Sequence, residues 1–599
     1  MAKKLPSKVS AAAQQRAASP SVPVPAGDLF TRTEAWLGRH AVAVFWSVFA
    51  LSMLLTFGLF EMKIGLANDD ALYMEAASHY SKDFFGYFYR ATAPLYSMVL
   101  GVVVAVFGSN IVILKLFSVL FFAVSLYLIF RVFRGRIPYA VLFAALFITA
   151  TNHLFLLHAV LTYTECFFAM VQMFFLWAVL RLIDKTENGE GIAVTWKAWL
   201  LYGAMAGVMY MSRNVATAAP AAVAAYFLWN RQWKNVVYAL FFAVFFALVY
   251  ESLKWMIWDL PFFSQFEDQG GKMLREKIFN PADPNNKPEN LAGYFKRFWG
   301  NVEVYIGGRF WELLGLAKEN GKLTAGGQLG LTLLGLALIL QGVVFALLRK
   351  NKTVLLVSLY YAALCGATYF GIHTYWAQAR LIMIYFPFIF ITIFYGFYEL
   401  FSTRALGGFK FFWFVVVLLF LLPNLFRSMG KVPANLKTLS RNAAGDEFYG
   451  YTPDWVNFFK ASRWSARNLP EGSYVASRRA PMSFVYGDFK EFYGVYSLNS
   501  DDPDSLLARF KNNGVTHVLL AELRVQPNRY IPNRFINTLH RYVMTIAMKY
   551  PQAFELVHTE GTLEKAEVYK IRYDLATPEH AVTPDGRPLM SGKKEDAEE

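Results

Sequence analysis

Long apolar runs separated by short basic clusters dominate roughly the first 430 residues of this 599-residue chain. The first run covers residues 41–60, and ten more of similar character follow it. A membrane-spanning helix needs about 20 predominantly apolar residues, so the pattern predicts an all-α bundle of about eleven transmembrane helices. The later spans are expected near residues 111–130, 138–156, 166–183, 198–212, 214–229, 235–256, 326–348, 353–371, 381–400 and 409–426.

One further apolar run, residues 93–107, is too short to span a bilayer and decides the topology. If it crossed, most of the later basic clusters would fall outside the cell, against the positive-inside rule. We therefore expect this run to lie in the outer interface or to dip in and return. The short loops that then become cytoplasmic carry Arg131, Arg134, Arg136, Arg181, Lys185, Lys197, Arg231, Lys234, Arg349, Lys350, Lys352, Arg404 and Lys410.

Composition agrees with this class. The chain is 56% hydrophobic and only 17% charged, whereas soluble domains carry about 25% charged residues. Its net charge of +15 resides in short clusters between apolar runs, which argues against nucleic acid as a partner. Both cysteines, Cys166 and Cys365, lie in apolar runs and provide neither a disulfide framework nor a metal cluster.

The sequence divides into four parts. Residues 1–39 are expected to form a disordered cytoplasmic tail, and residues 40–427 the membrane domain, with outer loops at 61–110 and 257–325. Residues 428–577 have the composition of a small extracytoplasmic α/β domain, and residues 578–599 read as a loose tail. In the α/β domain we expect helices at 453–469, 503–512 and 533–550, and strands at 473–477, 516–521, 554–558 and 567–573.

Two adjacent acids, Asp69 and Asp70, follow directly after the first span. Asn68 before them can cap a helix over residues 71–80, and acids suit the positive end of a helix dipole. Capping explains why acids are tolerated here, but acids at a membrane edge are functional candidates in their own right. We therefore interpret Asp69 and Asp70 as part of a site.

Other polar residues fall at the outer ends of the predicted spans. A lone Lys or Arg at a span end often reaches toward lipid headgroups, and Glu165 alone could merely join helices. His79, His153 and His158 are interpreted as satisfied polar residues rather than metal ligands. Acids and bases that converge on one face, however, indicate a site that binds an anionic group beside a carboxylate. The residues on this face are Asp69, Asp70, Lys115, Glu165, Arg213, His373, Tyr375, Gln378 and Arg380.

The order of these residues resembles that of the GT-C membrane glycosyltransferases, in the branch that holds the protein O-mannosyltransferases and the lipid A aminoarabinose transferases. The resemblance covers about residues 40 to 400. Its motifs are the acidic pair, Tyr73, residues 91–96 (Ala-Thr-Ala-Pro-Leu-Tyr), Phe107-Gly108, Lys115, Glu165 and Arg380. It implies a polyprenyl-phosphate sugar as donor and Asp69 as the base.

The chain departs from the family pattern at several positions. Asp70 stands where the family usually has Glu, and Thr92 replaces a phosphate-holding lysine, for which Arg90 is the candidate substitute. Lys115 replaces an Arg and Arg213 a Lys, so charge is kept while bidentate geometry changes.

The residue types suit an inverting sugar transfer. A carboxylate can take the proton of the attacking hydroxyl, and cations can stabilise the phosphate that leaves. We hypothesise that Asp69 is the base and that Glu165 orients the acceptor or supports the site. Arg380, with Arg90 and Arg213, would bind phosphate, and Tyr73, Lys115, His373 and Tyr375 complete the candidate substrate-binding set. A hydrolase would need two carboxylates that flank the bond, which Asp69 and Asp70 cannot do, although Asp69 and Glu165 could.

The expected partners are a polyprenyl-phosphate sugar donor, a glycan, lipid or protein acceptor, and membrane lipids. A divalent cation, Mg²⁺ or Mn²⁺, is compatible with acids beside a phosphate, although no ligand spacing requires one. The sequence style indicates a bacterial inner membrane, with the amino terminus in the cytoplasm and the C-terminal domain in the periplasm. A lipid or solute transporter that uses the same charges is the alternative, and a scaffold that anchors an outer domain is a weaker one.

Overall fold

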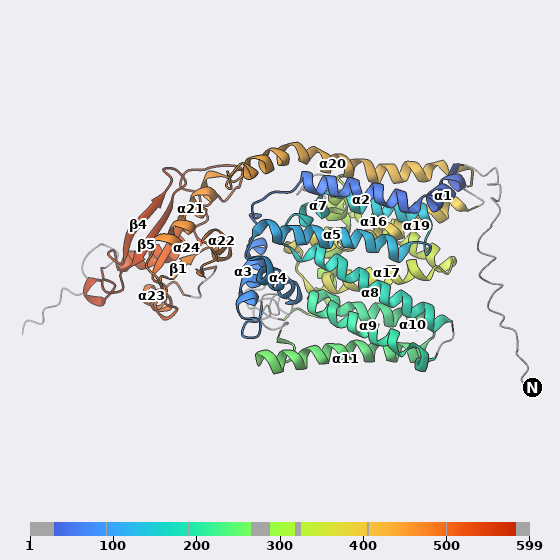
Figure 1. Ribbon diagram of the computed structural model, residues 1–599, viewed down its shortest axis with the longest axis horizontal. Helices are drawn as coiled ribbons and strands as arrows, with labels where there is room; N and C mark the ends of the chain where they lie inside the picture. The colour runs from blue at the N-terminus through green and yellow to red at the C-terminus, as the bar shows by residue number, and fades with distance from the viewer. Residues whose placement is uncertain are drawn as a thin grey trace, which may run out of the picture.

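The computed structural model describes residues 29–90, 93–188, 191–264, 288–317, 325–403, 407–496, 498 and 500–582. A bundle of long, roughly aligned helices occupies one end of the molecule, and a smaller domain with a sheet occupies the other (Figure 1). The predicted fold class, a polytopic helical membrane protein with a small C-terminal α/β domain, is confirmed.

Within the described residues, eight helices are long and apolar enough to cross a membrane. They are α2 (Ala41–Gly58), α5 (Ile111–Phe133), α8 (Thr164–Glu187), α9 (Ile192–Ser212), α11 (Trp233–Trp258), α16 (Ala325–Leu348), α17 (Lys352–Gly371) and α20 (Phe411–Ala443). A ninth span is the pair α6 (Tyr139–Thr151) and α7 (His153–Ala159), which is bent by 57°.

The two remaining segments of the predicted eleven are apolar but shorter. The first is η1 (Asn214–Ala218) with α10 (Ala219–Trp229), and the second is α18 (Arg380–Met383) with α19 (Phe386–Ser402). All eleven predicted apolar runs therefore contain helix, whereas helix length within the described residues supports eight or nine spans.

The short run after the first span forms α4 (Leu95–Phe107), which packs against α3 (Asn68–Lys82) at the end of the bundle that faces the C-terminal domain (Figure 1). Gly101 permits this packing, because a Cβ atom there would lie 2.5 Å from Cβ of Tyr80. With 13 residues, α4 is shorter than a spanning helix requires.

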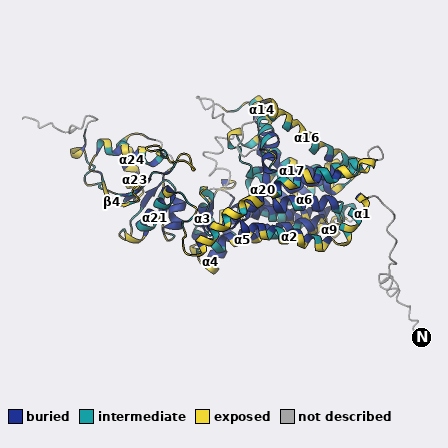
Figure 2. Cartoon of the chain, turned by 90° about the horizontal axis from the view of Figure 1, so that it is seen from above, coloured by how far each residue is buried: buried dark blue, intermediate teal, exposed yellow. Residues whose placement is uncertain are grey.

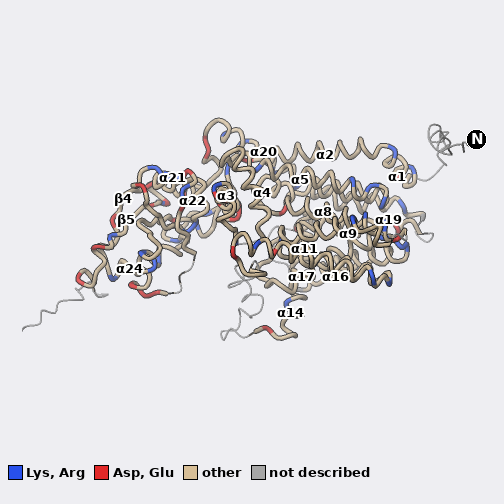
Figure 3. The backbone as a smooth tube through the Cα atoms, turned by 60° about the horizontal axis from the view of Figure 1, so that its bottom comes forward, with Lys and Arg blue, Asp and Glu red and all other residues tan. Residues whose placement is uncertain are grey.

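The far end of the bundle is rich in Lys and Arg, near α1 (Leu29–Arg39) and the end of α19 (Figure 3). These cations pair with acids of neighbouring helices, as in Arg136 with Asp184 at 2.5 Å and Arg349 with Glu399 at 2.8 Å. The prediction of a disordered tail is wrong for residues 29–39. They form α1 because the Glu34 carboxylate accepts hydrogen bonds from the amides of Tyr139 and Ala140, at the start of α6.

Helix α20 joins the two parts of the molecule. Its 33 residues correspond to a length of about 50 Å, and Figure 1 shows it running along the bundle to the C-terminal domain. Asn435 on its outer half donates hydrogen bonds to the carbonyls of Gly58 and Phe60, which ties the helix to the end of α2. The boundary expected at 427/428 therefore falls inside one continuous helix.

The C-terminal domain has a five-stranded mixed sheet in the order β2-β1-β3-β5-β4. Strands β1, β2 and β3 are parallel, whereas β5 runs antiparallel to β3 and to β4. The strands are β1 (Val475–Ser477), β2 (Phe492–Gly494), β3 (His517–Ala521), β4 (Phe554–Glu560) and β5 (Ala566–Ile571), and the helices α21 (Pro453–Asn468), α22 (Ala480–Tyr486), α23 (Pro503–Asn512) and α24 (Thr538–Lys549).

Sequence patterns predicted all of these elements except α22 and β2. Helix α22 has seven residues, all of them buried, and β2 has three residues. Neither segment therefore shows an alternation of hydrophobic and polar positions from which it could be predicted. The expected loose tail begins later than residue 578, because Ala581 is buried and the Val582 amide donates to the Lys549 carbonyl. Residues 583–599, like residues 1–28, lie outside the described residues.

Three short helical segments lie within the expected outer loop 257–325. They are α14 (Leu291–Val302), the π-helical turn η2 (Glu303–Arg309) and α15 (Phe310–Leu313). Of that loop, residues 265–287 and 318–324 lie outside the described residues. Figure 2 shows the buried residues concentrated along the inward faces of the bundle and between α3 and the C-terminal domain.

A buried amide pair fixes α20 in the bundle. Asn424 donates to the Ile148 carbonyl and the Thr151 hydroxyl, and its own oxygen accepts a 2.8 Å hydrogen bond from Asn152. We predict that Asn424→Leu costs about 1–3 kcal/mol, because it leaves buried donors and acceptors unpaired. Thermal unfolding in detergent should show a lower midpoint, whereas the same change at the exposed Asn513 should leave the midpoint unaltered. An unchanged midpoint for Asn424→Leu would contradict this role.

Candidate active site

The acidic stretch enters the structure as the first turn of α3. Asp70 is fully buried, and its carboxylate accepts 2.7 Å hydrogen bonds from the amides of Gly65 and Thr162 as well as one from the Thr162 hydroxyl. The capping prediction for Asn68 is wrong, because α3 begins at Asn68 itself and no side chain caps it. The Asn68 amide instead donates to the Tyr496 hydroxyl of the C-terminal domain at 3.3 Å.

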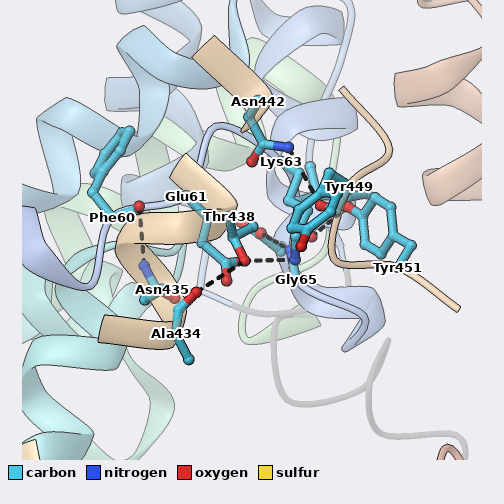
Figure 4. A network of polar contacts seen from close by, with 12 residues as sticks. Phe60, Glu61, Lys63, Gly65, Ala434, Asn435, Thr438, Asn442, Tyr449 and Tyr451 are labelled. Atoms are coloured by element: carbon cyan, nitrogen blue, oxygen red, sulfur yellow. Dashed lines mark hydrogen bonds and ion pairs between the residues drawn. The ribbon is translucent and has the colours of Figure 1, made fainter. Parts of the chain in front are cut away.

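The segment between α2 and α3 is held from two sides. Lys115 is buried beneath it and donates 2.6 Å hydrogen bonds to the carbonyls of Glu61 and Lys63. From the other side, the Tyr451 hydroxyl donates to the Ile64 carbonyl at 2.6 Å, and the Lys63 ammonium lies 4.5 Å from the centre of the Tyr451 ring. Figure 4 shows this contact region, where α20 and the segment after it meet residues 60–65.

A cavity of about 510 Å³ opens beside the start of α3. Five of the ten candidate site residues line it: Asp69, Tyr73, Glu165, Arg213 and Arg380. They come from four separate parts of the chain, namely α3, the starts of α8 and α18, and the junction of α9 with η1. The structure therefore gathers acids and cations that are up to 311 positions apart, from 69 to 380, at one place.

Two ion pairs organise the cavity wall. Arg380 contacts the Asp69 carboxylate at 2.7 Å, and Arg213 contacts the Glu165 carboxylate at 3.3 Å. The first pair is partly open, since the side chains are 27% and 38% exposed, whereas Glu165 is only 2% exposed. A buried ion pair keeps its charges only when further polar contacts satisfy them. The second oxygen of Glu165, Oε2, and Nη1 of Arg213 are buried without a hydrogen-bond partner in this structure, as polar atoms reserved for a ligand would be.

The remaining five candidates lie elsewhere. Asp70 and Lys115 are buried behind the cavity, and their polar atoms are engaged with the chain itself, so they hold the loop in place. Arg90 is exposed and lines a separate hollow with Trp258 and Asp259. His373 and Tyr375 stack on each other, 5.6 Å apart, next to but outside the cavity lining.

The cavity also contains residues that the sequence did not single out. Tyr89, Asn214, Trp376 and Tyr385 line it with the charged groups. Trp376 and Arg380 lie in one short stretch with Gln378, whose side-chain oxygen accepts a 2.7 Å hydrogen bond from Nε of Arg380. Aromatic residues at a span end resemble an ordinary interfacial belt, so no sequence signal separates these from the many others.

The cavity does not present a metal site. The Asp69 carboxylate faces Arg380, and that of Asp70 is occupied by amide and hydroxyl donors. Among the described residues, three potential ligands gather instead at Glu75, His79 and Glu491, whose ligand atoms lie within 4.8 Å of one another where α3 meets the C-terminal domain. The acids of the cavity are therefore engaged with cations and hydrogen-bond donors of the chain and do not fit the divalent cation considered from the sequence.

These features define a class. A membrane-embedded helical bundle with a short interfacial helix pair, a charged cavity at one end and a small α/β domain over that end are typical of GT-C membrane glycosyltransferases. Residues 91–257 match the family model for dolichyl-phosphate-mannose-protein mannosyltransferase. No curated protein matches the chain.

The fold is shared with a solved structure. An oligosaccharyltransferase from Archaeoglobus fulgidus, tethered to an acceptor peptide, is similar with a TM-score of 0.50 and 12% identity over 90% of this chain and 75% of that one. For ArnT from Cupriavidus metallidurans, bound to undecaprenyl phosphate, the TM-score is 0.48 and the sequence identity is 14%, over 90% of this chain and 99% of that one. The family match and the shared fold confirm the resemblance to GT-C glycosyltransferases.

One acid where α3 meets the C-terminal domain is expected to titrate well above the usual range of a carboxyl group. Burial, reinforced by the nearby Glu491, raises the pKa of Glu75 from 4.5 to about 8. The unfolded chain ionises this group first as the pH rises, so the folded state loses stability between about pH 4.5 and 8. We predict that Glu75→Gln removes this loss. As the pH rises through that range, the thermal-unfolding midpoint of the wild type should fall relative to that of Glu75→Gln. Glu471→Gln, at an exposed position, should show no such trend relative to the wild type. Parallel pH profiles of wild type and Glu75→Gln would refute the shift.

Proposed function

We propose that this protein is an integral-membrane glycosyltransferase. It moves a sugar from a polyprenyl-phosphate donor to a hydroxyl or phosphate of a protein, lipid or glycan acceptor, with inversion at the anomeric carbon. The observation that carries the proposal is the pairing of Asp69 with Arg380 and of Glu165 with Arg213 around one cavity. The match of residues 91–257 to a dolichyl-phosphate-mannose-dependent family supports a lipid-phosphate sugar as donor.

The reaction needs one base and a place for a leaving phosphate. Asp69 takes the proton of the acceptor hydroxyl as that oxygen bonds to the anomeric carbon. The bond from the anomeric carbon to the phosphate oxygen breaks at the same time, and polyprenyl phosphate leaves with the electron pair. Cations that face the phosphate stabilise the charge that develops on it, so no second catalytic acid is required.

Arg380 is suited to exchange partners during this reaction. It faces Asp69 in the present structure, and a guanidinium can bind a phosphate through two parallel hydrogen bonds. When the donor phosphate binds Arg380, the Asp69 carboxylate leaves this ion pair and can accept the proton of the acceptor hydroxyl. Arg213, through its unpartnered Nη1, supplies a second donor to the phosphate, and Glu165 holds Arg213 in position.

The apolar part of the cavity suits a lipid-linked substrate. Leu72, Val215, Ala367, Ile372 and Leu381 line it together with the charged residues. A polyprenyl chain can lie along such a surface while its phosphate reaches the cations. A water-soluble donor such as a sugar nucleotide would gain nothing from these side chains.

The charge distribution supports an orientation. Basic residues gather at the end of the bundle opposite α3 (Figure 3), so we place that end and the amino terminus in the cytoplasm. The cavity and the C-terminal domain then lie on the outer face, which in a bacterial inner membrane is the periplasm. Asp69 and Arg380 share this face, as a common site requires.

The role of Asp69 can be tested directly. We predict that Asp69→Asn lowers the transfer rate by about 10²- to 10⁴-fold, the usual contribution of a general base. The assay incubates purified protein with a radiolabelled polyprenyl-phosphate sugar and measures release of polyprenyl phosphate, which a transporter would not produce. Asp83→Asn, at an exposed acid just beyond α3, is the matched control and should retain full activity. Full activity of Asp69→Asn would remove the assignment.

Arg380 should affect the donor rather than the fold. We predict that Arg380→Gln raises the donor KM by about 10- to 100-fold, because a hydrogen bond to a charged group contributes about 1.5–3 kcal/mol. Arg380→Lys should recover part of the loss, since it keeps the charge without the fork. Arg349→Gln, at the opposite end of the bundle, provides a control with a similar ion pair. Equal donor KM values for Arg380→Gln and Arg349→Gln would exclude Arg380 from donor binding.

A further inference from the structure

Two adjacent arginines, Arg478 and Arg479, directly follow β1, which is the central one of the three parallel strands. The chain leaves β1 through α22 to β2 on one side, and then passes through α23 to β3 on the other side. The strand order therefore reverses between β1 and β3. In open α/β sheets, ligands bind outside the carboxyl ends of the strands at such a switch point. Arg478 and Arg479 stand at that place.

The guanidinium groups of this pair lack the partners that other arginines of the domain have. Nε and Nη1 of Arg478 and Nε of Arg479 are buried and have no hydrogen-bond partner. Arg463, Arg467 and Arg524 in the same domain are each paired with a carboxylate, those of Glu447, Asp488 and Glu564.

Unpaired buried donors destabilise a protein unless a ligand or water satisfies them. Burial, followed by the positive charge of Arg479, lowers the pKa of Arg478, and the nearby Tyr496 acts in the opposite direction. Within the described residues neither arginine forms an ion pair with a carboxylate, and two such adjacent cations favour the binding of an anion.

The arginine pair lies on the side of the domain that meets the candidate active site. The guanidinium of Arg478 lies 4.9 Å from the centre of the Tyr496 ring. The Tyr496 hydroxyl accepts the hydrogen bond from Asn68, the residue that precedes Asp69. Helix α22, which begins directly after Arg479, packs against α3. A continuous set of contacts therefore leads from Arg478 through Tyr496 and Asn68 to the proposed base.

We propose that Arg478 and Arg479 bind an oxyanion, a phosphate or a carboxylate, that the acceptor carries. This inference rests on the proposed transferase function and assigns the C-terminal domain a part in choosing the acceptor. The planar guanidinium fork matches both oxyanions in a bidentate manner, and two adjacent forks favour a doubly charged group. The donor phosphate has its own cations in Arg213 and Arg380, so the pair on the sheet serves the second substrate.

Chemical footprinting tests the site without knowledge of the acceptor. The full-length protein, in phosphatidylcholine nanodiscs, is treated with phenylglyoxal, and arginine modification is mapped by mass spectrometry. Inorganic phosphate should slow modification of Arg478 and Arg479 at least threefold relative to sodium chloride of equal ionic strength, whereas the paired Arg467 should not change. Equal rates with both salts, or equal slowing at all three arginines, would overturn the anion site. Protection in phosphatidylglycerol nanodiscs alone would identify a membrane headgroup as occupant and overturn the acceptor role.

Kinetics separates this role from a structural one. With an envelope lipid and glycan extract as acceptor source, the double variant Arg478→Gln/Arg479→Gln should raise the half-saturating extract concentration about tenfold and leave the donor KM unaltered. Arg478→Lys/Arg479→Lys should recover part of the effect. A double variant with wild-type acceptor dependence, or with a raised donor KM, would contradict the proposal. If the wild type itself released no polyprenyl phosphate, the transferase function would fail, while phosphate protection would still report the anion site.

Discussion

The buried carboxylate of Asp70 is the constraint on which the site depends. It joins the start of α3 to Gly65 on one side and to Thr162 on the other, and so connects the first loop with the entry to α8. A fully buried carboxylate is stable only when donors surround it, and here backbone amides provide them. The adjacent Asp69 is thereby held at the cavity wall with its side chain partly open. Of two neighbouring acids, one fixes the loop and the other remains available for chemistry.

The charges of the site are arranged in pairs that differ in burial. Glu165 with Arg213 is the closed pair, and Asp69 with Arg380 is the open one. An open pair costs little to separate, because water and a ligand can replace each partner, whereas separating a closed pair leaves a buried charge uncompensated. The structure thus places the exchangeable cation next to the proposed base and the fixed cation deeper in the cavity.

The C-terminal domain contributes to the geometry of the membrane part. Helix α20 enters it without a break, Tyr451 bonds to the loop that carries the acids, and Tyr496 contacts Asn68. These contacts place the domain against the end of the bundle that holds α3 (Figure 1). Because the domain touches the residue before Asp69, a ligand on its sheet can lie close to the reaction without entering the membrane.

The sequence by itself determined the apolar helical segments, the α/β class of the C-terminal domain and five of the residues that line the cavity, because apolar periodicity and charges at span ends are local properties. The sequence did not reveal that Asp70 and Lys115 form hydrogen bonds with backbone groups, or that Arg90 lines another hollow. It also did not reveal that α20 continues through the domain boundary expected at 427/428. It also passed over Arg478 and Arg479, which look like an ordinary surface pair. Only the tertiary structure decides which polar atoms find partners within the chain, since those partners lie far away in sequence.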